Sequence, residues 1–295
     1  MKRFSQLLSV ATATTVAALF ATSASAQLNN PFLWELSKGG KTMYLFGSLH
    51  IGKPDFYPVP PAIRLRFDEA EILAVEADVT EPATRNACQR LAVTEEKIEK
   101  LLSADELLEL TRYLQAAKVN PKAVEGKKLW MVNLLLTVIE LQQLGVDFED
   151  GPDVVVARQA RELKKKIVEI EGPKQCAALA GADQAESLAG LNRFLTSVRE
   201  NKMERRIDLM LDAYRAGDGN AIHKVSTEEY GDTPMGKKSK ARVFDDRHPI
   251  MAETIDGYFA KKESHFVVIS AGRMFGDNNL AQALEKRGVK LKRVQ

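Results

Sequence analysis

The stretch Tyr44-Leu45-Phe46-Gly47-Ser48-Leu49-His50-Ile51-Gly52 (YLFGSLHIG) joins an apolar run to one of the four histidines of the chain. The apolar run predicts a buried β-strand, and Gly47 would let the backbone turn sharply or approach a ligand closely where the strand ends. A similar stretch, FVVISAGRMFG, lies near the other end of the chain, with Gly272 followed by Arg273 where a histidine would stand. Each stretch predicts a strand that presents a polar side chain just beyond its last residue.

Strand and helix patterns alternate on both sides of these two stretches. Near the N-terminus, the patterns predict a hairpin with strands over residues 32–36 and 43–47. They then predict a helix over residues 58–70 and a further strand over residues 72–77. Near the C-terminus they predict a helix, a strand, a helix and a strand over residues 246–260, 266–269, 279–287 and 289–294. A strand, a crossover helix and a second strand form a right-handed unit with parallel strands. The strand ends that carry His50 and Glu76 are therefore expected at one edge of the sheet.

The centre of the chain reads as helical. Ser103 and Glu106 form a capping box, and the most apolar helix, residues 127–144, carries enough polar residues to favour a buried core helix over a membrane span. A helix is expected over residues 152–163, followed by a strand over residues 166–170 that ends at Glu171. A long helix over residues 185–216 is expected to break near Asn201, and residues 227–242 are expected to form a polar loop. We therefore expect an α/β fold with a single mixed β-sheet, built from N- and C-terminal strand-helix units around a helical central region.

The N-terminus carries an export pattern. Lys2 and Arg3 precede an apolar run, and Ala24-Ser25-Ala26 has the small-x-small character of a cleavage site, so residues 1–26 are typical of a secretory signal peptide. The apolar run is short beside the ~20 residues that a spanning helix needs. We expect a periplasmic or secreted protein, with one domain over residues 27–295 and no transmembrane segment after cleavage.

Charge and cysteine content narrow the function classes. The chain has 42 basic and 40 acidic side chains, and loss of Lys2 and Arg3 would leave a formally neutral protein, which argues against a nucleic-acid partner. The sequence has no Gly-x-Ser-x-Gly elbow, His-Glu-x-x-His helix or Gly-Lys-Ser/Thr loop, so a serine hydrolase or nucleotide-binding protein has no support. In an oxidising compartment, Cys88 and Cys176 would form either one disulfide or two separate buried thiols.

Four polar residues share one position relative to the predicted strands. His50, Glu76, Glu171 and Arg273 each lie at or just past the C-terminal end of a strand, which is the edge where open α/β sheets bind ligands. An imidazole with carboxylates can bind a divalent metal ion, whose bound water is a potential nucleophile. The alternative is a hydrogen-bonded structural histidine beside solvated carboxylates. Of the other histidines, His265 is expected at an exposed turn.

Several motifs in order resemble the TraB/GumN family, which is related to the Tiki proteins. They are the segments LWEL, GKTMYLFGSLHIG, PPAI, AEILAVEADV, GVDFED, VVVARQARELKKKIVEIEGPKQCAAL, AYRAGD, FDDRHPIMAETI and FVVISAGRMFGDNNLAQALEKRGVKLKRV. The resemblance implies a Gly-x-x-His motif at each end of the chain. It also implies a metal-dependent hydrolase site of the kind associated with the Tiki branch, which is taken to cleave peptides.

The first motif of that family is intact in this chain and the second departs from it. Gly47-Ser48-Leu49-His50 matches, and so do the acidic residues Glu76 and Glu171 and the arginine Arg247. In the second motif, Ser270 replaces the glycine and Arg273 the histidine, while His248 stands where the family usually has asparagine. A guanidinium is permanently cationic and is a poor metal ligand.

These observations lead to one leading hypothesis and one alternative. The leading hypothesis is a divalent-metal-dependent hydrolase that acts on peptide or related amide bonds with manganese, cobalt or zinc, so a peptide or protein is the expected partner. The assigned roles are metal ligation by His50, Glu76 and Glu171, with Glu76 or Glu171 as general base; anion or oxyanion binding by Arg247 and Arg273; and close backbone approach at Gly47 and Gly272.

Three arrangements of the site stay open. In the first, His50 and the two glutamates still hold a metal ion, with His248 as a replacement donor. In the second, Arg273 clamps a carboxylate or phosphate of the substrate. In the third, the protein is a catalytically inactive family member that acts as a binding protein of the cell envelope. The sequence carries no signal for an oligomeric state.

Overall fold

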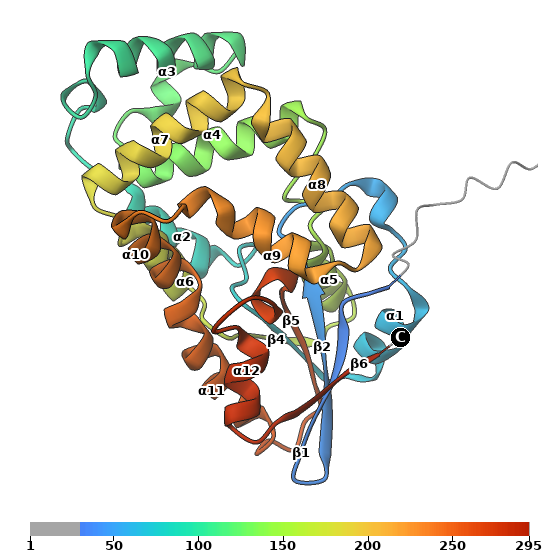
Figure 1. The fold of residues 1–295 in the computed structure, drawn as a ribbon. Coiled ribbons are helices and arrows are strands. Elements are labelled where there is room, and N and C mark those ends of the chain that lie inside the picture. The colour runs from blue at the N-terminus through green and yellow to red at the C-terminus, as the bar shows by residue number, and fades with distance from the viewer. Residues whose placement is uncertain (1–29, 295) are drawn as a thin grey trace, which may run out of the picture.

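A computed structural model describes residues 30–294, which form one mixed six-stranded sheet with helices around it (Figure 1). The expected signal peptide lies outside the described residues. The order across the sheet is β4-β3-β5-β2-β1-β6. The strands are β1 (Leu33–Lys38), β2 (Lys41–Ser48), β3 (Ile72–Val75), β4 (Lys166–Glu169), β5 (His265–Ser270) and β6 (Lys290–Val294).

Helices make up most of the rest of the described chain. The α-helices are α1 (Pro61–Glu69), α2 (Pro82–Ala92), α3 (Ala104–Ala116), α4 (Leu129–Gln143), α5 (Pro152–Glu162), α6 (Lys174–Ala180), α7 (Gln184–Arg199), α8 (Lys202–Ala216), α9 (Gly219–Thr227), α10 (Pro234–Val243), α11 (His248–Tyr258) and α12 (Leu280–Lys286). Short 3-10 helices are η1 (Pro54–Phe56), η2 (Ile98–Lys100), η3 (Pro121–Val124), η4 (Glu228–Tyr230), η5 (Asp245–Arg247) and η6 (Ala271–Met274).

The sheet has a parallel half and an antiparallel half. β2, β5, β3 and β4 pair in parallel, whereas β1 pairs antiparallel with β2 and β6. The β1–β2 hairpin turns at Gly39 and Gly40, both of which have positive φ. The four parallel strands end at one edge, as the sequence predicts. However, β5 lies between β2 and β3, so the two strands joined through α1 are parallel but not neighbours.

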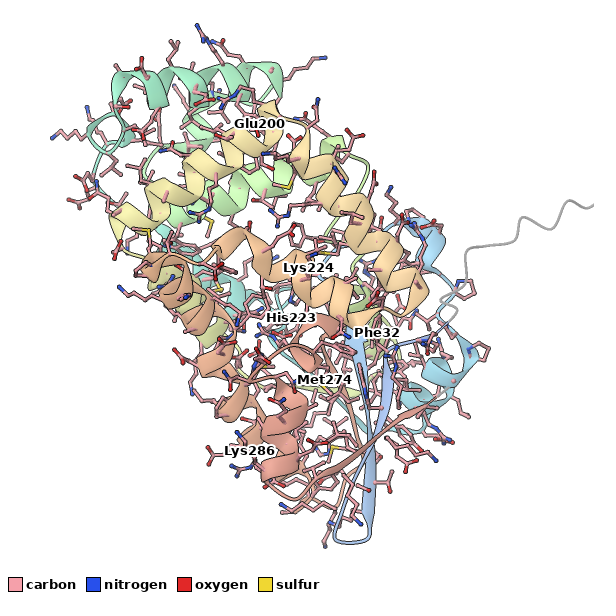
Figure 2. All side chains as sticks on the ribbon, in the orientation of Figure 1. Phe32, Glu200, His223, Lys224, Met274 and Lys286 are labelled. Carbon is pink, nitrogen blue, oxygen red and sulfur yellow. A yellow bond between two sulfur atoms is a disulfide. The ribbon has the colours of Figure 1, made fainter. Side chains whose placement is uncertain are left out.

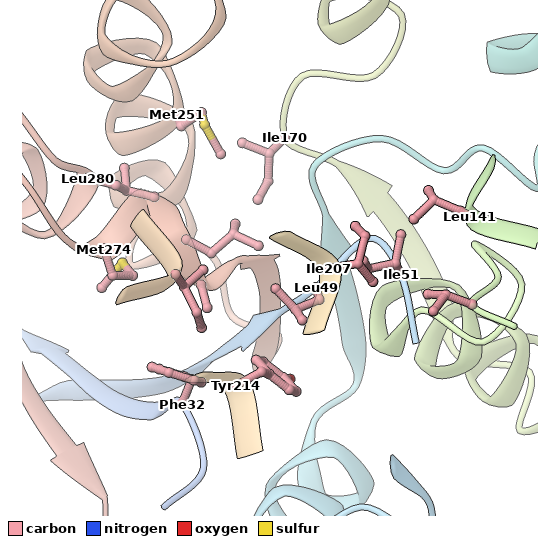
Figure 3. Close-up of a cluster of buried hydrophobic side chains, with 14 of the residues drawn as sticks. Phe32, Leu49, Ile51, Leu141, Ile170, Ile207, Tyr214, Met251, Met274 and Leu280 are labelled. Carbon is pink, nitrogen blue, oxygen red and sulfur yellow. The ribbon is translucent and has the colours of Figure 1, made fainter. Parts of the chain in front are cut away.

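Both faces of the sheet are covered. On one face, Phe46 and Phe266 pack with Ile63 and Phe67 of α1 and with side chains of α5 in one buried cluster. Side chains of the opposite face, such as Val267, belong to a larger cluster with residues of α8, α11 and α12. Figure 3 shows part of this larger cluster, where residues that flank the strands, such as Phe32 and Ile170, meet residues of distant helices, such as Tyr214. Strand residues therefore alternate between two cores.

The helical centre stands beyond the end of the parallel strands. Figure 1 shows α3, α4, α7 and α8 on the side toward which β2 points. The Ser103–Glu106 capping box is present at the start of α3, as predicted. The break near Asn201 is confirmed too, since Asn201 adopts a left-handed conformation, with φ of 54°, between α7 and α8. Among residues 30–294, no helix has the length and apolar character needed to cross a bilayer.

A disulfide settles the alternative left open for the two cysteines. Cys88 on α2 and Cys176 on α6 are bonded, with their Cα atoms 5.5 Å apart. α2 is the next helix after β3 and Glu76, and α6 begins just after Glu171. The disulfide therefore links two helices that lead away from the same edge of the sheet.

Three local predictions were wrong. The segment expected as a polar loop contains α10, whose first turn is capped by the Thr233 hydroxyl and begins with Pro234. The first helix begins at Pro61 rather than at Pro58. His265 is buried rather than exposed, because its ring stacks on Tyr258 with the centroids 4.4 Å apart.

Candidate functional site

The parallel edge brings the predicted site residues into one region. His50 lies two residues beyond β2, Glu76 directly follows β3, Glu171 lies two residues beyond β4, and Arg273 lies in η6 directly after β5. Arg247, which ends η5, reaches the same region through its guanidinium. The site is therefore assembled from segments far apart in the sequence and brought together by the strand order.

Glu76 is buried and held by cations. Its side chain is 3% exposed, and Arg273 Nε donates to Oε1 and Oε2 at 3.0 and 3.1 Å. The Ser270 amide also donates to Oε1 at 2.7 Å, and Arg247 Nη2 lies 3.5 Å from Oε2. Burial alone would raise the pKa of Glu76, but the charges of Arg273, His50 and Arg247, with Arg273 foremost, lower it to about 2. Glu76 is therefore ionised across the neutral range.

Glu171 is paired in a similar way. Arg247 Nε donates to Oε1 at 2.8 Å, while Arg247 Nη2 donates to Oε2. Both side chains are buried, and Arg247 Nη1 also donates to the Val243 carbonyl at 2.8 Å. A bidentate guanidinium-carboxylate pair of this kind fixes both orientations. Arg247 thus links the ends of β3 and β4 through their glutamates.

His50 pairs with a carboxylate that was not predicted from the sequence. His50 Nδ1 donates to Asp153 Oδ2 at 2.6 Å, since an ionised carboxylate only accepts. Burial would lower the pKa of His50, but the charge and hydrogen bond of Asp153, with a smaller contribution from Glu76, raise it above its ordinary value. The His50 side chain is 38% exposed. It is therefore the accessible member of the site, with Nε2 left for a ligand or a proton.

Close backbone packing positions Asp153. Gly52 and Asp147 form an isolated bridge, and the Gly52 amide donates to the Asp147 carbonyl at 3.0 Å. A Cβ on Gly52 would lie 1.9 Å from the Asp150 carbonyl oxygen, and one on Gly151 would lie 2.9 Å from the His50 backbone. The His50 segment and the loop before α5 can therefore lie against each other only with glycine at positions 52 and 151.

A small cavity adjoins this pair. Its volume is about 20 Å³, and its lining includes Ser48, His50, Glu76, Asp78 and Asp153. That volume has room for about one water molecule. Asp153 Oδ1 is buried and has no hydrogen-bond partner among the described protein atoms. A water in this cavity would have polar groups on several sides.

The two predicted glycines have different surroundings. A Cβ on Gly47 would lie 2.8 Å from Phe32 Cβ, and the Gly47 carbonyl accepts a hydrogen bond from the buried Tyr214 hydroxyl at 3.0 Å. A Cβ on Gly272 would have no neighbour closer than 3.5 Å among the described residues outside its adjacent chain. Gly47 is thus needed for packing, and an approach to a ligand at either glycine stays a prediction.

The predicted metal ligands do not fit a divalent ion as they are paired in this structure. A metal ion needs lone pairs that other cations do not occupy. Guanidinium groups engage both oxygens of Glu76 and of Glu171. Of the three predicted metal ligands, this leaves His50, whose Nε2 has a lone pair that no guanidinium occupies. Over residues 30–294, no group of three or more His, Cys, Asp or Glu side chains is arranged to hold a metal ion. The manganese, cobalt or zinc ion stays a prediction.

His248 lies close to the guanidinium pairs but has its own environment. It is buried, and its Nδ1 donates to the Asn278 carbonyl at 2.7 Å. Burial lowers the pKa of His248 to about 4, so the ring is neutral at pH 7 and Nε2 carries a lone pair. This nitrogen has no hydrogen-bond partner within the described part of the chain.

Comparison with known proteins now identifies the family. The model of the TraB/PrgY/gumN family matches residues 32–293, nearly all of the described chain. The chain belongs to the TraB/PrgY/gumN family. The resemblance inferred from the sequence motifs is therefore confirmed.

Two relatives illustrate how far the family likeness extends. The protein is 25% identical over 252 residues to the uncharacterized protein YbaP of Escherichia coli, a match that covers 83% of this chain and 89% of YbaP. It is 20% identical over 313 residues to the metalloprotease TIKI1 of Danio rerio, a match that covers 88% of this chain and 62% of TIKI1. No solved structure matches the chain.

Asp153 was not among the predicted site residues, although the sequence carries a signal for it. The segment GVDFED, which resembles the family, leads directly into Gly151 and the predicted helix at Pro152. An acidic residue in the first turn of a helix is stabilised by the helix dipole, and such a carboxylate beside a histidine is a common way to orient the ring. What the sequence could not supply was the contact between two residues 103 positions apart.

Proposed function

We propose that this protein is an exported hydrolase that cleaves peptide or related amide bonds, with the His50–Asp153 pair as its reactive centre. The observation that carries the proposal is the 2.6 Å contact between His50 Nδ1 and Asp153 Oδ2 beside a cavity of water size. The distant relative TIKI1, whose name describes a metalloprotease, supports the choice of peptide bonds.

The pair has the arrangement of a general base with its orienting carboxylate. With the Nδ1 proton directed at Asp153, Nε2 of the neutral ring can accept a proton from a water molecule. The water oxygen then attacks the amide carbon, and the imidazolium returns the proton to the leaving nitrogen as the C–N bond breaks. Asp153 stabilises the imidazolium between these two steps, which agrees with the raised pKa of His50.

The guanidinium pairs would give the site its electrostatic character. Arg273 and Arg247 surround Glu76 with positive charge while both remain tied to carboxylates. In a buried setting such preorganised groups need no reorganisation when charge develops on a substrate. We assign them to holding the edge of the site in position, and no step passes through a metal ion.

A specific observation favours a second candidate, a binding protein of the cell envelope without catalytic activity. Arg273 stands where the family motif has its second histidine, and it saturates the carboxylate that a metal-dependent site would use. The exported location is a proposal for both candidates. The Cys88–Cys176 disulfide supports it, because disulfides persist in oxidising compartments.

A peptide-library digest by purified residues 27–295 tests the first candidate. The natural chain, Asp153→Asn and the surface control Asp208→Asn would each be assayed with chelator and then with manganese, cobalt or zinc. Cleavage that survives chelator and falls in Asp153→Asn alone supports the metal-free general base. Cleavage that appears only with an added metal would reject that mechanism and restore the metal-dependent one. No cleavage under any condition would favour the binding protein.

A metal measurement on the same samples separates the candidates further. Elemental analysis after dialysis would report ions per chain for the natural protein and for Arg273→His. An ion gained only in Arg273→His would show that the arginine keeps the metal out. An ion bound by the natural chain would show instead that the guanidinium pairs do not exclude a metal from the site.

A further inference from the structure

A second, larger pocket lies away from the His50 cavity. It has a volume of about 580 Å³ and lies between the start of α11 and helix α12. No residue lines both this pocket and the His50 cavity. Small-molecule sites usually have volumes of roughly 300 to 1,000 Å³. The pocket is thus large enough for a ligand of its own.

His248 gives this pocket a buried acceptor. The side chain lines the pocket, and the residue is 1% exposed. Its Nδ1 proton is used on the Asn278 carbonyl, so the neutral ring can only accept at Nε2. That nitrogen is buried without a partner among the described residues. Buried polar atoms are nearly always hydrogen-bonded, so this one indicates a small donor, such as a water molecule, at the wall of the pocket.

The charged groups of the pocket divide into paired and unpaired ones. Asp245 is held by Lys240 at 2.9 Å, and Arg287 lies 3.2 Å from Asp256. Within residues 30–294, neither Asp246 nor Lys286 has an ion-pair partner within 4.0 Å. Figure 2 shows Lys286 at the end of α12, at the periphery of the molecule. The pocket therefore offers one free carboxylate and one free ammonium.

We propose that this pocket binds a small zwitterion, namely a free amino acid or a short peptide. The ammonium group of the ligand would pair with Asp246, beside the His248 ring, and its carboxylate would pair with Lys286. Both charges of such a ligand have a counterpart in the lining. The inference goes beyond the proposed hydrolase and does not depend on it.

Imidazole NMR of the full mature chain tests this proposal, since the chain has only four histidines to assign. The probes are L-alanine and L-alanyl-L-alanine, with N-acetyl-alanyl-alanine amide as the uncharged control. We expect a saturable shift of the His248 resonances with at least one zwitterionic probe and none with the blocked peptide. The two zwitterions distinguish an amino acid from a peptide as the ligand.

Variants connect the shift to the pocket. Asp246→Lys and Lys286→Glu should each weaken binding by about tenfold or more, which corresponds to 1.4 kcal/mol. Asp208→Lys and Lys262→Glu are exposed charge reversals outside the pocket and should leave binding unchanged. His50→Ala should also bind normally, which keeps the test apart from the hydrolase proposal. The inference is overturned if neither zwitterion shifts His248, if the blocked peptide binds equally, or if both pocket variants bind like the natural chain.

Discussion

At the residue scale, the chemistry of the site depends on which groups hold each charge. His50 is oriented by Asp153, while Glu76 and Glu171 are each held by a guanidinium. Types of residue at strand ends could be predicted from the sequence, because each follows an apolar run. The pairing could not, since every one of these contacts joins residues more than 70 positions apart.

Asp153→Asn is expected to shift the titration of His50 to lower pH. The charge and hydrogen bond of the carboxylate raise the pKa of His50, so their removal should lower that pKa. Because a general base works when deprotonated, activity should rise with pH through the His50 pKa, and the rise should begin at lower pH in the variant. Histidine NMR titration measures the pKa directly. An unchanged His50 pKa would contradict the assigned role of Asp153.

Arg273→Gln is expected to destabilise the fold by about 3 to 5 kcal/mol, because it leaves the buried Glu76 carboxylate poorly compensated. The matched control is Arg287→Gln, which removes a more exposed pair with Asp256 and should cost no more than about 1 kcal/mol. Urea unfolding at pH 7 compares the two. Equal losses for both variants would show that Arg273 contributes no more than a surface arginine.

The same pair makes the fold sensitive to acid in a defined direction. The folded pKa of Glu76, at about 2, lies below the ordinary glutamate value of 4.5. Its ionisation therefore contributes stability that is present above the ordinary value and is lost as pH falls toward 2. Arg273→Gln should raise the pKa of Glu76, so the variant should lose less stability on acidification than the natural chain. Parallel losses from pH 7 to pH 3 would contradict this linkage.

At the element scale, capping and periodicity identified most helices and strands. Ser103 and Glu106 fixed the start of α3, and the break at Asn201 was visible because a polar residue interrupts the helical pattern. α10 was missed since its run of lysines and serine is typical of a loop. The Thr233-Pro234 start signal was nevertheless present. Buried partners for Ser239 and Arg242, both on Glu186, explain why this polar segment is helical.

The disulfide should contribute strongly to the stability of the paired elements. Cys88 and Cys176 close a loop with a sequence separation of 88. Loop-closure entropy predicts that Cys88→Ala/Cys176→Ala loses about 4 to 5 kcal/mol. The disulfide joins α2 and α6, which lead away from Glu76 and Glu171. Hydrogen exchange in the double variant should therefore increase in these two helices before it increases in α1. A double variant as stable as the natural chain would show that the bridge does not constrain the unfolded chain.

At the scale of the whole molecule, the strand order decides what the site contains. The sequence predicted parallel strand ends at one edge, and the sheet confirms this arrangement. It did not predict that β5 would enter between β2 and β3, because strand order depends on contacts between the two ends of the chain. This insertion brings Arg273 to Glu76 and makes the site of this family member rich in guanidinium groups.

We assign His50 as the reactive base of a peptide hydrolase. The most direct measurement is mass-spectrometric detection of fragments when a peptide library is incubated with mature natural protein or with His50→Gln, both verified as folded by thermal unfolding. We predict fragments from the natural chain and a loss of at least about a hundredfold in His50→Gln, as expected for removal of a general base. Equal cleavage by the two proteins, or no cleavage by the natural chain, would contradict the claim.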